Sequence, residues 1–190
     1  MSLATLLTMV VQVLEEAGVP YMLTGSVASA YYAQPRATQD LDFVIDAPLS
    51  RIHAVVDGLR ARGLYVSRDA AEQAFRARGQ FNAIDPVTGW KADLIFRKNR
   101  PFSEEEFGRR TPAVVVGVSV SLPTPEDLIV AKLEWSQLGD SELQRRDVVQ
   151  LVEKVWRTLD RSYIERWVEE LGLQSAWAAI LGDAAQPQDD

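Results

Sequence analysis

Short apolar runs and longer amphipathic stretches alternate along the first 122 residues of the chain. Apolar runs bounded by turn residues predict strands at 20–24, 40–46, 80–85 and 90–96, with further strand-rich sequence at 114–122. The longer stretches predict helices at 3–17, 26–34 and 49–62, the last one between Pro48 and Gly63. This alternation predicts an α+β fold in which helices flank a mixed sheet.

Local signals define several of the connections. Residues 85–89 read Asp-Pro-Val-Thr-Gly, a strong turn sequence between two predicted strands, and Gly117 indicates a turn or a bulge. Ser103 and Glu106 have the spacing of a capping box, which predicts a short helix capped by Ser103.

From Thr124 onwards the pattern becomes helical. Pro125 at the first helical position and acidic residues in the first turn mark a helix start. Helices are expected at 125–138, 141–156, 160–171 and 173–181, and a disordered acidic tail at 184–190. The chain thus divides into a mixed-sheet domain at 1–122 and a C-terminal helical bundle at 123–183.

Composition narrows the functional classes. The chain has 190 residues and no cysteine, which excludes disulfides, thiolate metal sites and cysteine catalysis. The formal charge of −7 arises entirely after residue 122, because residues 1–122 hold 13 basic and 13 acidic side chains. This balance argues against a dedicated duplex-DNA binder. The apolar segment at 3–14 is too short to span a bilayer and lacks a basic leader, so we expect a cytoplasmic protein without a membrane partner.

The candidate chemistry lies between residues 25 and 42. Gly25 and Ser26 stand where a strand turns into a helix, and the N–H groups of a helix N-terminus suit a phosphate. Asp40 and Asp42 are two positions apart on a predicted strand, so their side chains point to the same face. Paired carboxylates repel each other unless a cation joins them, and hard oxygen ligands suit Mg²⁺.

These residues also carry a family resemblance. Gly-Ser at 25–26, thirteen further residues and Asp-Leu-Asp at 40–42 resemble the signature of the DNA-polymerase-beta-like nucleotidyltransferases, and more narrowly of their minimal and AbiEii-toxin-like members. Asp93, in Lys-Ala-Asp-Leu-Ile-Phe at 91–96, fits the third carboxylate of that family. The resemblance implies a palm-like nucleotidyltransferase domain at 1–122.

The resemblance also implies an activity. An acceptor hydroxyl attacks the α-phosphorus of a nucleoside triphosphate, and two Mg²⁺ ions, or Mn²⁺ in their place, stabilise the attacking and leaving oxygens. Asp40 and Asp42 are the predicted metal ligands. Asp93 completes one metal site, takes the proton of the acceptor hydroxyl, or does both. All three count as catalytic in this interpretation.

Five further positions are predicted to contact the nucleotide. Ser26 and Gly25 would hold a phosphate, with an ordinary serine helix cap as the alternative. Arg36 and Thr38 would contact the substrate or steady the loop before Asp40. Lys132, in Pro-Glu-Asp-Leu-Ile-Val-Ala-Lys-Leu at 125–133, matches a family lysine near the phosphates. The alternatives are a lysine whose ammonium group extends to solvent and one paired with Glu134 or Asp147.

Two other features favour structural roles. Arg145-Arg146-Asp147 resembles a later family element, but its second acid is replaced here by Gln150, which favours a helix-packing ion pair. The five tryptophans are expected mainly in the core, with contact of Trp135, and of Tyr31 or Tyr32, with a nucleotide base as the alternative.

The predicted function is Mg²⁺-dependent transfer of a nucleoside monophosphate to a hydroxyl of an RNA 3′ end, a protein or a small molecule. The toxin-like resemblance favours tRNA or protein as acceptor and suggests a cognate antitoxin. The alternatives are a catalytically inactive nucleotide-binding module that acts through a protein partner, and a structural protein with a chance Asp-x-Asp. The nucleotide, the acceptor and the oligomeric state are not encoded in the motifs.

Overall fold

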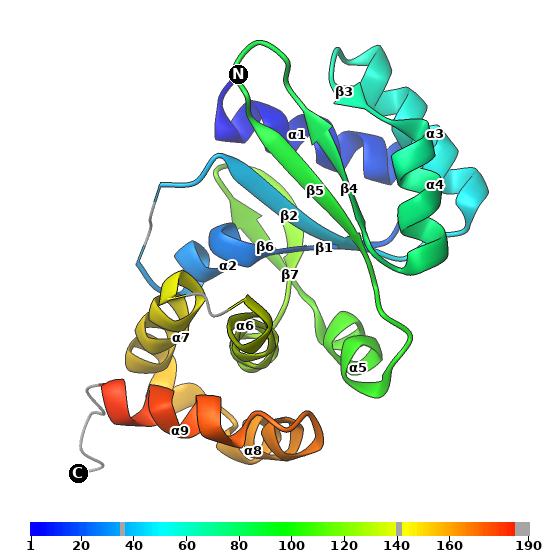
Figure 1. Cartoon of the computed structure of the whole chain (residues 1–190). Helices are drawn as coiled ribbons and strands as arrows, with labels where there is room; N and C mark the ends of the chain where they lie inside the picture. The colour runs from blue at the N-terminus through cyan, green and yellow to red at the C-terminus, as the bar shows by residue number, and fades with distance from the viewer. Residues whose placement is uncertain (35–36, 140–141, 185–190) are drawn as a thin grey trace.

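A five-stranded sheet forms the centre of the N-terminal half of the chain (Figure 1). The computed structural model describes residues 1–34, 37–139 and 142–184. The strand order is β1-β2-β5-β4-β3. The strands are β1 (Tyr21–Thr24), β2 (Asp40–Ile45), β3 (Tyr65–Val66), β4 (Gln80–Ile84) and β5 (Lys91–Phe96). Strands β2 and β5 are parallel and the other pairs are antiparallel, so the predicted mixed sheet is confirmed.

The two faces of this sheet differ in chemistry. Leu41, Phe43 and Ile45 of β2 are fully buried, as are Leu94 and Phe96 of β5. These residues form the core with three helices on one side of the sheet (Figure 1). The helices are α1 (Leu3–Glu16), α3 (Leu49–Ala61) and α4 (Arg68–Ala77). Because side chains alternate along a strand, the polar residues between them project from the opposite face.

A helix and a β-hairpin contact the β1 side of the sheet. Helix α2 (Gly25–Tyr32) follows β1 without an intervening loop. Strands β6 (Thr111–Val115) and β7 (Val118–Leu122) form a separate hairpin. The hairpin turn consists of Val116 and Gly117, which both have positive φ, so the turn predicted at Gly117 is confirmed.

The C-terminal residues are helical, as predicted. The elements are α6 (Pro125–Gly139), α7 (Glu142–Val155), the 3-10 turn η1 (Trp156–Thr158), α8 (Arg161–Glu170) and α9 (Gln174–Asp183). Ala184 is buried and its N–H donates to the Ile180 carbonyl, whereas residues 185–190 of the predicted tail lie outside the described residues.

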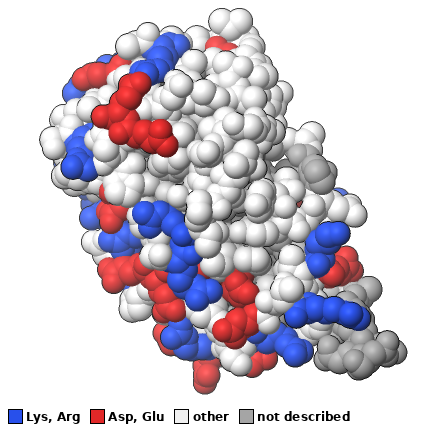
Figure 2. Space-filling model, turned by 180° about the vertical axis from the view of Figure 1, so that it is seen from behind, with Lys and Arg blue, Asp and Glu red and all other residues white. Residues whose placement is uncertain are grey.

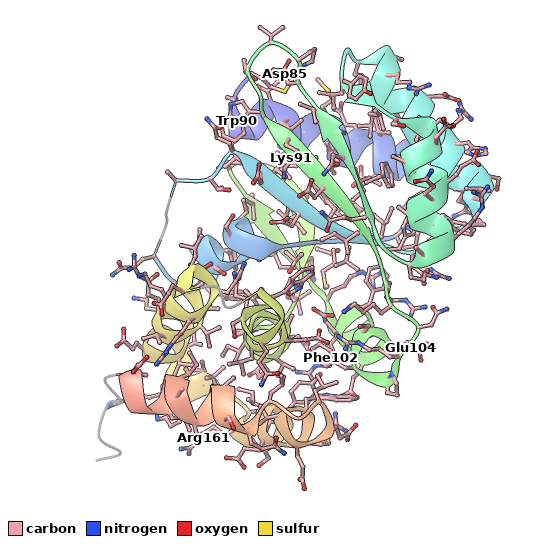
Figure 3. The ribbon with its side chains drawn as sticks, viewed as in Figure 1. Asp85, Trp90, Lys91, Phe102, Glu104 and Arg161 are labelled. Atoms are coloured by element: carbon pink, nitrogen blue, oxygen red, sulfur yellow. The ribbon has the colours of Figure 1, made fainter. Side chains whose placement is uncertain are left out.

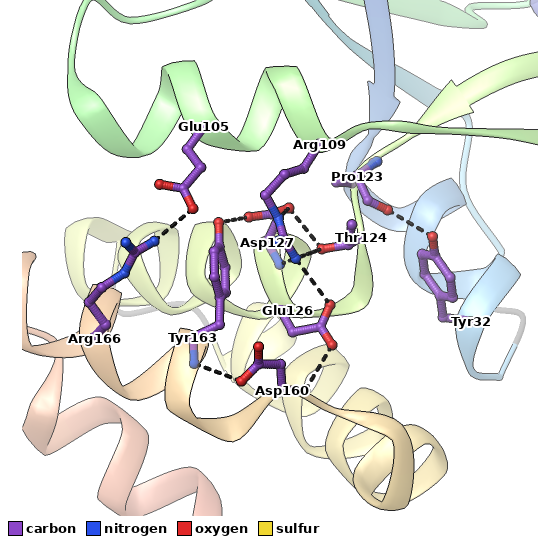
Figure 4. A network of polar contacts seen from close by, with 10 residues as sticks. All are labelled: Tyr32, Glu105, Arg109, Pro123, Thr124, Glu126, Asp127, Asp160, Tyr163 and Arg166. Carbon is purple, nitrogen blue, oxygen red and sulfur yellow. Dashed lines mark hydrogen bonds and ion pairs between the residues drawn. The ribbon is translucent and has the colours of Figure 1, made fainter.

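A buried polar network joins these helices to the N-terminal half (Figure 4). The Asp127 carboxylate of α6 is fully buried and accepts hydrogen bonds from the Thr124 hydroxyl at 2.7 Å and from Arg109 Nε at 3.1 Å. It also accepts one from the Tyr163 hydroxyl of α8. The Arg109 guanidinium lies 4.0 Å from the centre of the Tyr163 ring. Helix α5 (Pro101–Arg109), which carries Arg109, is therefore joined to α6 and α8 at one carboxylate.

The middle of the chain differs from the sequence-based prediction in two ways. First, strand β3 and helix α4 have no counterpart among the predicted elements. Second, the predicted cap of helix α5 is wrong. Helix α5 (Pro101–Arg109) begins before Ser103, with Arg100 as its N-cap residue and Pro101 at its start. Ser103 is therefore inside the helix, where its hydroxyl accepts a hydrogen bond from Arg100 Nε at 3.0 Å, and it does not cap it. Proline at the first helical position displaces the start because its fixed φ already suits a helix.

Charges of both signs are interspersed on the rear of the molecule, mainly over its lower half in Figure 2. Oppositely charged side chains also form ion pairs, such as Arg166 with Glu105 at 2.7 Å and Arg145 with Asp183 at 2.5 Å. Within the described residues, no helix has the length and apolar character that a membrane span requires.

Candidate active site

A row of polar residues crosses the open face of the sheet. Thr24 of β1 pairs with Asp42, Asp42 pairs with Asp93 of β5, and Asp93 pairs with Asn82 of β4. One row away, Asp40 pairs with Lys91. The parallel pairing of β2 and β5 therefore brings the three predicted aspartates to one place on one face.

Gly25 allows the backbone to approach Asp42. Its φ is +65°, and a Cβ atom added at this position would lie 1.9 Å from Asp42 Oδ2. Any side chain here would displace the carboxylate, and a residue with a Cβ would also strain the backbone. Glycine is therefore required by the contact itself.

The N-terminus of α2 opens beside this contact. The N-cap residue Thr24 makes no side-chain capping hydrogen bond, so no side chain caps the first-turn N–H groups in the usual way. Ser26 is buried at the second position of the helix. The alternative in which Ser26 is the helix cap is therefore wrong, because Thr24 is the N-cap residue. The Ser26 hydroxyl lies in the first turn of the helix, where phosphates bind.

Two side chains hold Asp93 in position. Asn82 Nδ2 donates to Asp93 Oδ1 at 2.5 Å, and Lys91 Nζ lies 3.1 Å from Asp93 Oδ2. Lys91, labelled in Figure 3, also lies 3.7 Å from Asp40 Oδ2. Burial lowers the pKa of Lys91, but the hydrogen bond and the charge of Asp93 outweigh it and leave the pKa raised. Lys91 is therefore a charged counter-ion of the acidic group, which consists of Asp40, Asp42 and Asp93.

The negative charge of the site is only partly compensated. Burial raises the pKa of Asp42, and the charges of Asp93 and Asp40 raise it further against the opposing effect of Lys132 and Lys91. Among the described residues, no three His, Cys, Asp or Glu side chains are grouped as a ready metal site. Lys91 lies within ion-pair distance of both Asp93 and Asp40. The crowded carboxylate oxygens nevertheless have the hard-donor chemistry that Mg²⁺ prefers.

A cleft of about 250 Å³ opens over this group. Its lining joins the sheet to α6 and α7 through Thr24, Gly25, Asp42, Gln80, Asp93, Ile95, Leu128, Ala131, Lys132, Trp135 and Gln144. Two of the predicted aspartates and the predicted lysine therefore share one cleft, whereas Asp40 is not among its lining residues.

Lys132 is almost fully buried in the wall of this cleft. Its Nζ donates to Asp147 Oδ2 at 2.8 Å and to Gln144 Oε1 at 2.9 Å. The alternative of an ion pair with Asp147 is confirmed, and so is the helix-packing ion pair expected for residues 145–147. The ammonium group is fixed between α6 and α7 while it borders the cleft.

Trp135, Gln80 and Gln144 also line the cleft, and Trp135 is 46% exposed. The expectation that Trp135 lies in the core is wrong. Its position on α6, three residues after Lys132, was the available signal, because residues three apart share a helix face.

The loop before β2 is described in part. The Thr38 hydroxyl accepts a hydrogen bond from the Asp40 N–H at 3.2 Å, so Thr38 steadies the start of the strand. Arg36 lies outside the described residues.

Solved structures with the same fold come from nucleotide-transfer enzymes and related proteins. The antibiotic-resistance factor ANT(2'')-Ia superposes with a TM-score of 0.59 at 16% identity, over 94% of this chain and 95% of that one. The lincosamide antibiotic adenylyltransferase LnuA, lincomycin-bound, gives 0.55 at 14% identity, over 80% and 96% of the two chains. An antigenic nucleotidyltransferase-like protein from Paracoccidioides brasiliensis gives 0.54 at 17% identity, over 90% of each.

No protein-family model matches the sequence, and a search of curated proteins finds no match. At these identities the likeness establishes architecture. The mixed sheet with flanking helices and the helical C-terminal part are those of the nucleotidyltransferase fold.

Proposed function

We propose that this protein is a Mg²⁺-dependent nucleotidyltransferase that moves a nucleoside monophosphate from a triphosphate to a hydroxyl acceptor. The observation that carries the proposal is the pairing of Asp42 with Asp93 across two parallel strands, against the Gly25 backbone at a helix N-terminus without a side-chain cap. Carboxylates next to the N–H groups of a helix N-terminus can bind cations and phosphates together, as phosphoryl transfer requires.

Each residue has a role in this proposal. Asp40, Asp42 and Asp93 would hold the divalent ions, which neutralise charge on the transferring phosphate when bound. The first-turn N–H groups of α2, with Gly25 and Ser26, would hold the triphosphate. Lys132 would supply positive charge at the cleft wall, and Thr38 would fix the start of β2. Lys91 would leave Asp93 once a cation replaces its charge.

The comparisons favour a small-molecule acceptor. ANT(2'')-Ia has been seen in complex with adenylyl-2''-tobramycin, and that chain is covered to 97%. LnuA is lincomycin-bound and is covered to 96%. A chain that matches such enzymes over nearly their whole length has the size of an enzyme for a small hydroxyl acceptor. We therefore place a small molecule before RNA or protein, and we keep the toxin role as the alternative.

The second candidate is a nucleotide-binding module without turnover. The ion pairs of Lys91 with Asp93 and Asp40 favour it, because an internal cation already occupies two of the carboxylates. Such a protein would bind a triphosphate and transfer nothing.

One experiment separates these candidates. The protein is incubated with each α-labelled NTP, Mg²⁺ and one acceptor source, namely tobramycin, lincomycin, total tRNA or cell lysate. Asp42→Asn is the test variant. Asp57→Asn is the control, because Asp57 is an exposed residue of α3.

Label transfer by the wild type and the control alone supports the enzyme. A melting temperature raised by NTP and Mg²⁺ without label transfer supports the binding module. The absence of both signals with all four nucleotides contradicts both candidates.

A further inference from the structure

A second, smaller cavity adjoins the cleft and is bounded by the sheet, α5 and α6. Its volume is about 70 Å³. It shares with the larger cleft the lining residues Thr24, Ile95, Ala131 and Trp135. A molecule in the cleft therefore has direct access to this smaller cavity.

Basic side chains outnumber acidic ones in the wall of the smaller cavity. Arg97, Lys98 and Arg100 line it together with Glu106 and Glu134. The Arg100 guanidinium occupies both oxygens of Glu134, with Nη2 donating to Oε2 at 2.6 Å and Nη1 donating to Oε1. Arg97 Nε donates at 2.9 Å to Asp46, which does not line the cavity. Each arginine thus has a carboxylate.

Lys98 adds a positive charge that these pairs do not balance. Its Nζ lies 3.8 Å from Glu134 Oε2, which is longer than a hydrogen bond, and that oxygen already accepts from Arg100. The Lys98 side chain is 44% exposed, and a loose pair at this exposure contributes little to stability. The ammonium group can therefore turn to an anion in the cavity at small cost.

Glu106 supplies a hydrogen-bond donor to the same cavity. The residue is only 7% exposed, and among the described residues its carboxyl group forms no hydrogen bond or ion pair. Burial raises its pKa to about 8, and the charge of Asp127 adds to this effect against the opposing charge of Arg100. Glu106 is therefore largely protonated at neutral pH and carries an O–H donor. A buried donor without an acceptor is costly, and an anion would satisfy it.

We propose that this cavity binds a carboxylate group of the acceptor molecule, between the Lys98 ammonium and the Glu106 carboxyl group. The inference rests on the proposed function of the cleft. The cavity has the volume of about two water molecules, at about 30 Å³ each in the liquid, so the two oxygens of a carboxylate fit in their place. One carboxylate also matches the single unbalanced charge of Lys98, whereas a phosphate group carries about −1.5 to −2.

The sheet fixes the distance between the two functional groups of the acceptor. Val44 and Ile95 on the cavity floor lie two residues beyond Asp42 and Asp93 on the same face, which corresponds to about 7 Å along the strands. The reacting hydroxyl would lie beside Asp93, and the carbon chain would pass Ile95 and Trp135. A 2-hydroxy acid, with both groups on adjacent carbons, is too short. The acceptor class is accordingly a longer hydroxy acid.

The test uses sodium acetate as the probe, with sodium chloride at the same concentration as the reference. Melting temperatures are measured at pH 7 with and without a non-hydrolysable ATP analogue and Mg²⁺. Lys98→Gln removes the charge and Glu106→Leu removes the donor, whereas Glu106→Gln keeps an N–H donor at the same place. Lys154→Gln is the matched control, because Lys154 is an exposed lysine of α7.

Acetate should raise the melting temperature of the wild type, Glu106→Gln and Lys154→Gln by about 3–6 °C when it exceeds its dissociation constant about tenfold. Lys98→Gln and Glu106→Leu should lose most of this rise. An equal acetate effect in all the variants, or none in the wild type, would overturn the inference. Because Lys98 is partly exposed, its variant keeps the test valid if Glu106→Leu does not fold.

The nucleotide arm of the experiment separates the acceptor from the nucleotide. The acetate effect should persist when the ATP analogue and Mg²⁺ are bound, since acceptor and nucleotide must bind together. Loss of the effect on nucleotide binding would assign the cavity to the nucleotide phosphates and overturn the inference. Absence of any stabilisation by the nucleotide would instead contradict the proposed function, whatever the acetate result.

Discussion

At the scale of single residues, Gly25 controls the position of Asp42. The glycine has a positive φ, and its Cα faces the carboxylate closely enough that an added Cβ would overlap Oδ2. The residue thereby links the conformation of the β1–α2 junction to the geometry of the acidic group. The positive φ and the close contact with Asp42 both require that residue 25 has no Cβ atom.

Gly25→Ala should therefore remove most of the activity. We expect at least a 100-fold loss of label transfer and a stability loss of about 1–3 kcal/mol from the strained backbone and the displaced carboxylate. Gly79→Ala is the control, since no atom lies within 4 Å of its added Cβ and its φ is not positive. Steady-state transfer rates and urea unfolding measure both effects. Wild-type activity in Gly25→Ala would contradict the proposed role of this contact.

Glu106 makes a pH-dependent contribution to stability. Its pKa is raised from 4.5 to about 8 on folding, so between these values the folded chain retains a proton that the unfolded chain has released. The free energy of unfolding attributable to Glu106 is fully present below pH 4.5, falls as the pH rises, and is lost above pH 8. We expect a loss of about 3–5 kcal/mol over this range.

Urea unfolding at pH 5, 7 and 9 tests this behaviour. At pH 5 the free energy of unfolding of Glu106→Gln should be lower than that of the wild type. At pH 9 this difference should become smaller, because only the wild type loses stability through ionisation of residue 106. Parallel pH profiles for the two proteins would show that Glu106 ionises normally.

At the scale of elements, α6 and α7 are joined by a buried ion pair. Lys132 and Asp147 are each at most 3% exposed, and their charged atoms lie 2.8 Å apart. This pair also fixes the wall of the cleft, because Lys132 lines it. The packing of two C-terminal helices thus determines where positive charge borders the acidic group.

Asp147→Asn should be strongly destabilising, because it removes the carboxylate that pairs with the buried Lys132 ammonium. We expect a loss of about 3–5 kcal/mol in urea unfolding, and a smaller loss for the double variant Lys132→Met with Asp147→Asn. Additive losses in the double variant would show that the two charges do not act as a pair.

The elements also show what the sequence can predict. The strands predicted at 40–46 and 90–96 correspond to β2 and β5, because apolar residues alternate or run together within these segments. Helix α4 was missed because its buried residues are the small Ala71 and Ala74 and half of its residues are charged or polar, although its apolar residues share one face. The available signal was Ser67, whose hydroxyl accepts a hydrogen bond from the Ala70 N–H as an N-cap.

The candidate site was predictable in its residue types and less so in its contacts. Asp40 and Asp42 share a face through strand periodicity, which is a local property. The pairing of Asp42 with Asp93, and the contact of Lys91 with both acidic partners, depend on which strands become neighbours. The spacing from Ser103 assigns Glu106 to a capping box. Its burial could not be predicted in this way, because it depends on packing against α6, which is distant in sequence.

At the scale of the whole molecule, the network around Asp127 joins the two halves of the chain. It includes Arg109 from α5 and Tyr163 from α8. A buried carboxylate that loses a hydrogen-bond donor destabilises the folded chain. Because the donors to Asp127 come from both halves, separating the halves would carry this cost, and we expect them to unfold together.

Tyr163→Phe tests this coupling. We expect a stability loss of about 1–3 kcal/mol, because Asp127 remains buried with one hydrogen-bond donor fewer. Tyr65→Phe is the control, since Tyr65 is 65% exposed. Urea unfolding followed by tryptophan fluorescence and by circular dichroism should give coincident transitions in the wild type. Two separate transitions would show that the halves are independent.

The parallel pairing of β2 and β5 has a consequence for the folding of the chain. Parallel neighbours need a long connection, and here α3, β3, α4 and β4 all lie between the two strands. The acidic group is therefore assembled only when this long loop has closed, a slow step in folding because its entropy is lost before the contacts form. Nucleotide binding during refolding should consequently appear late, after most of the helical signal has returned.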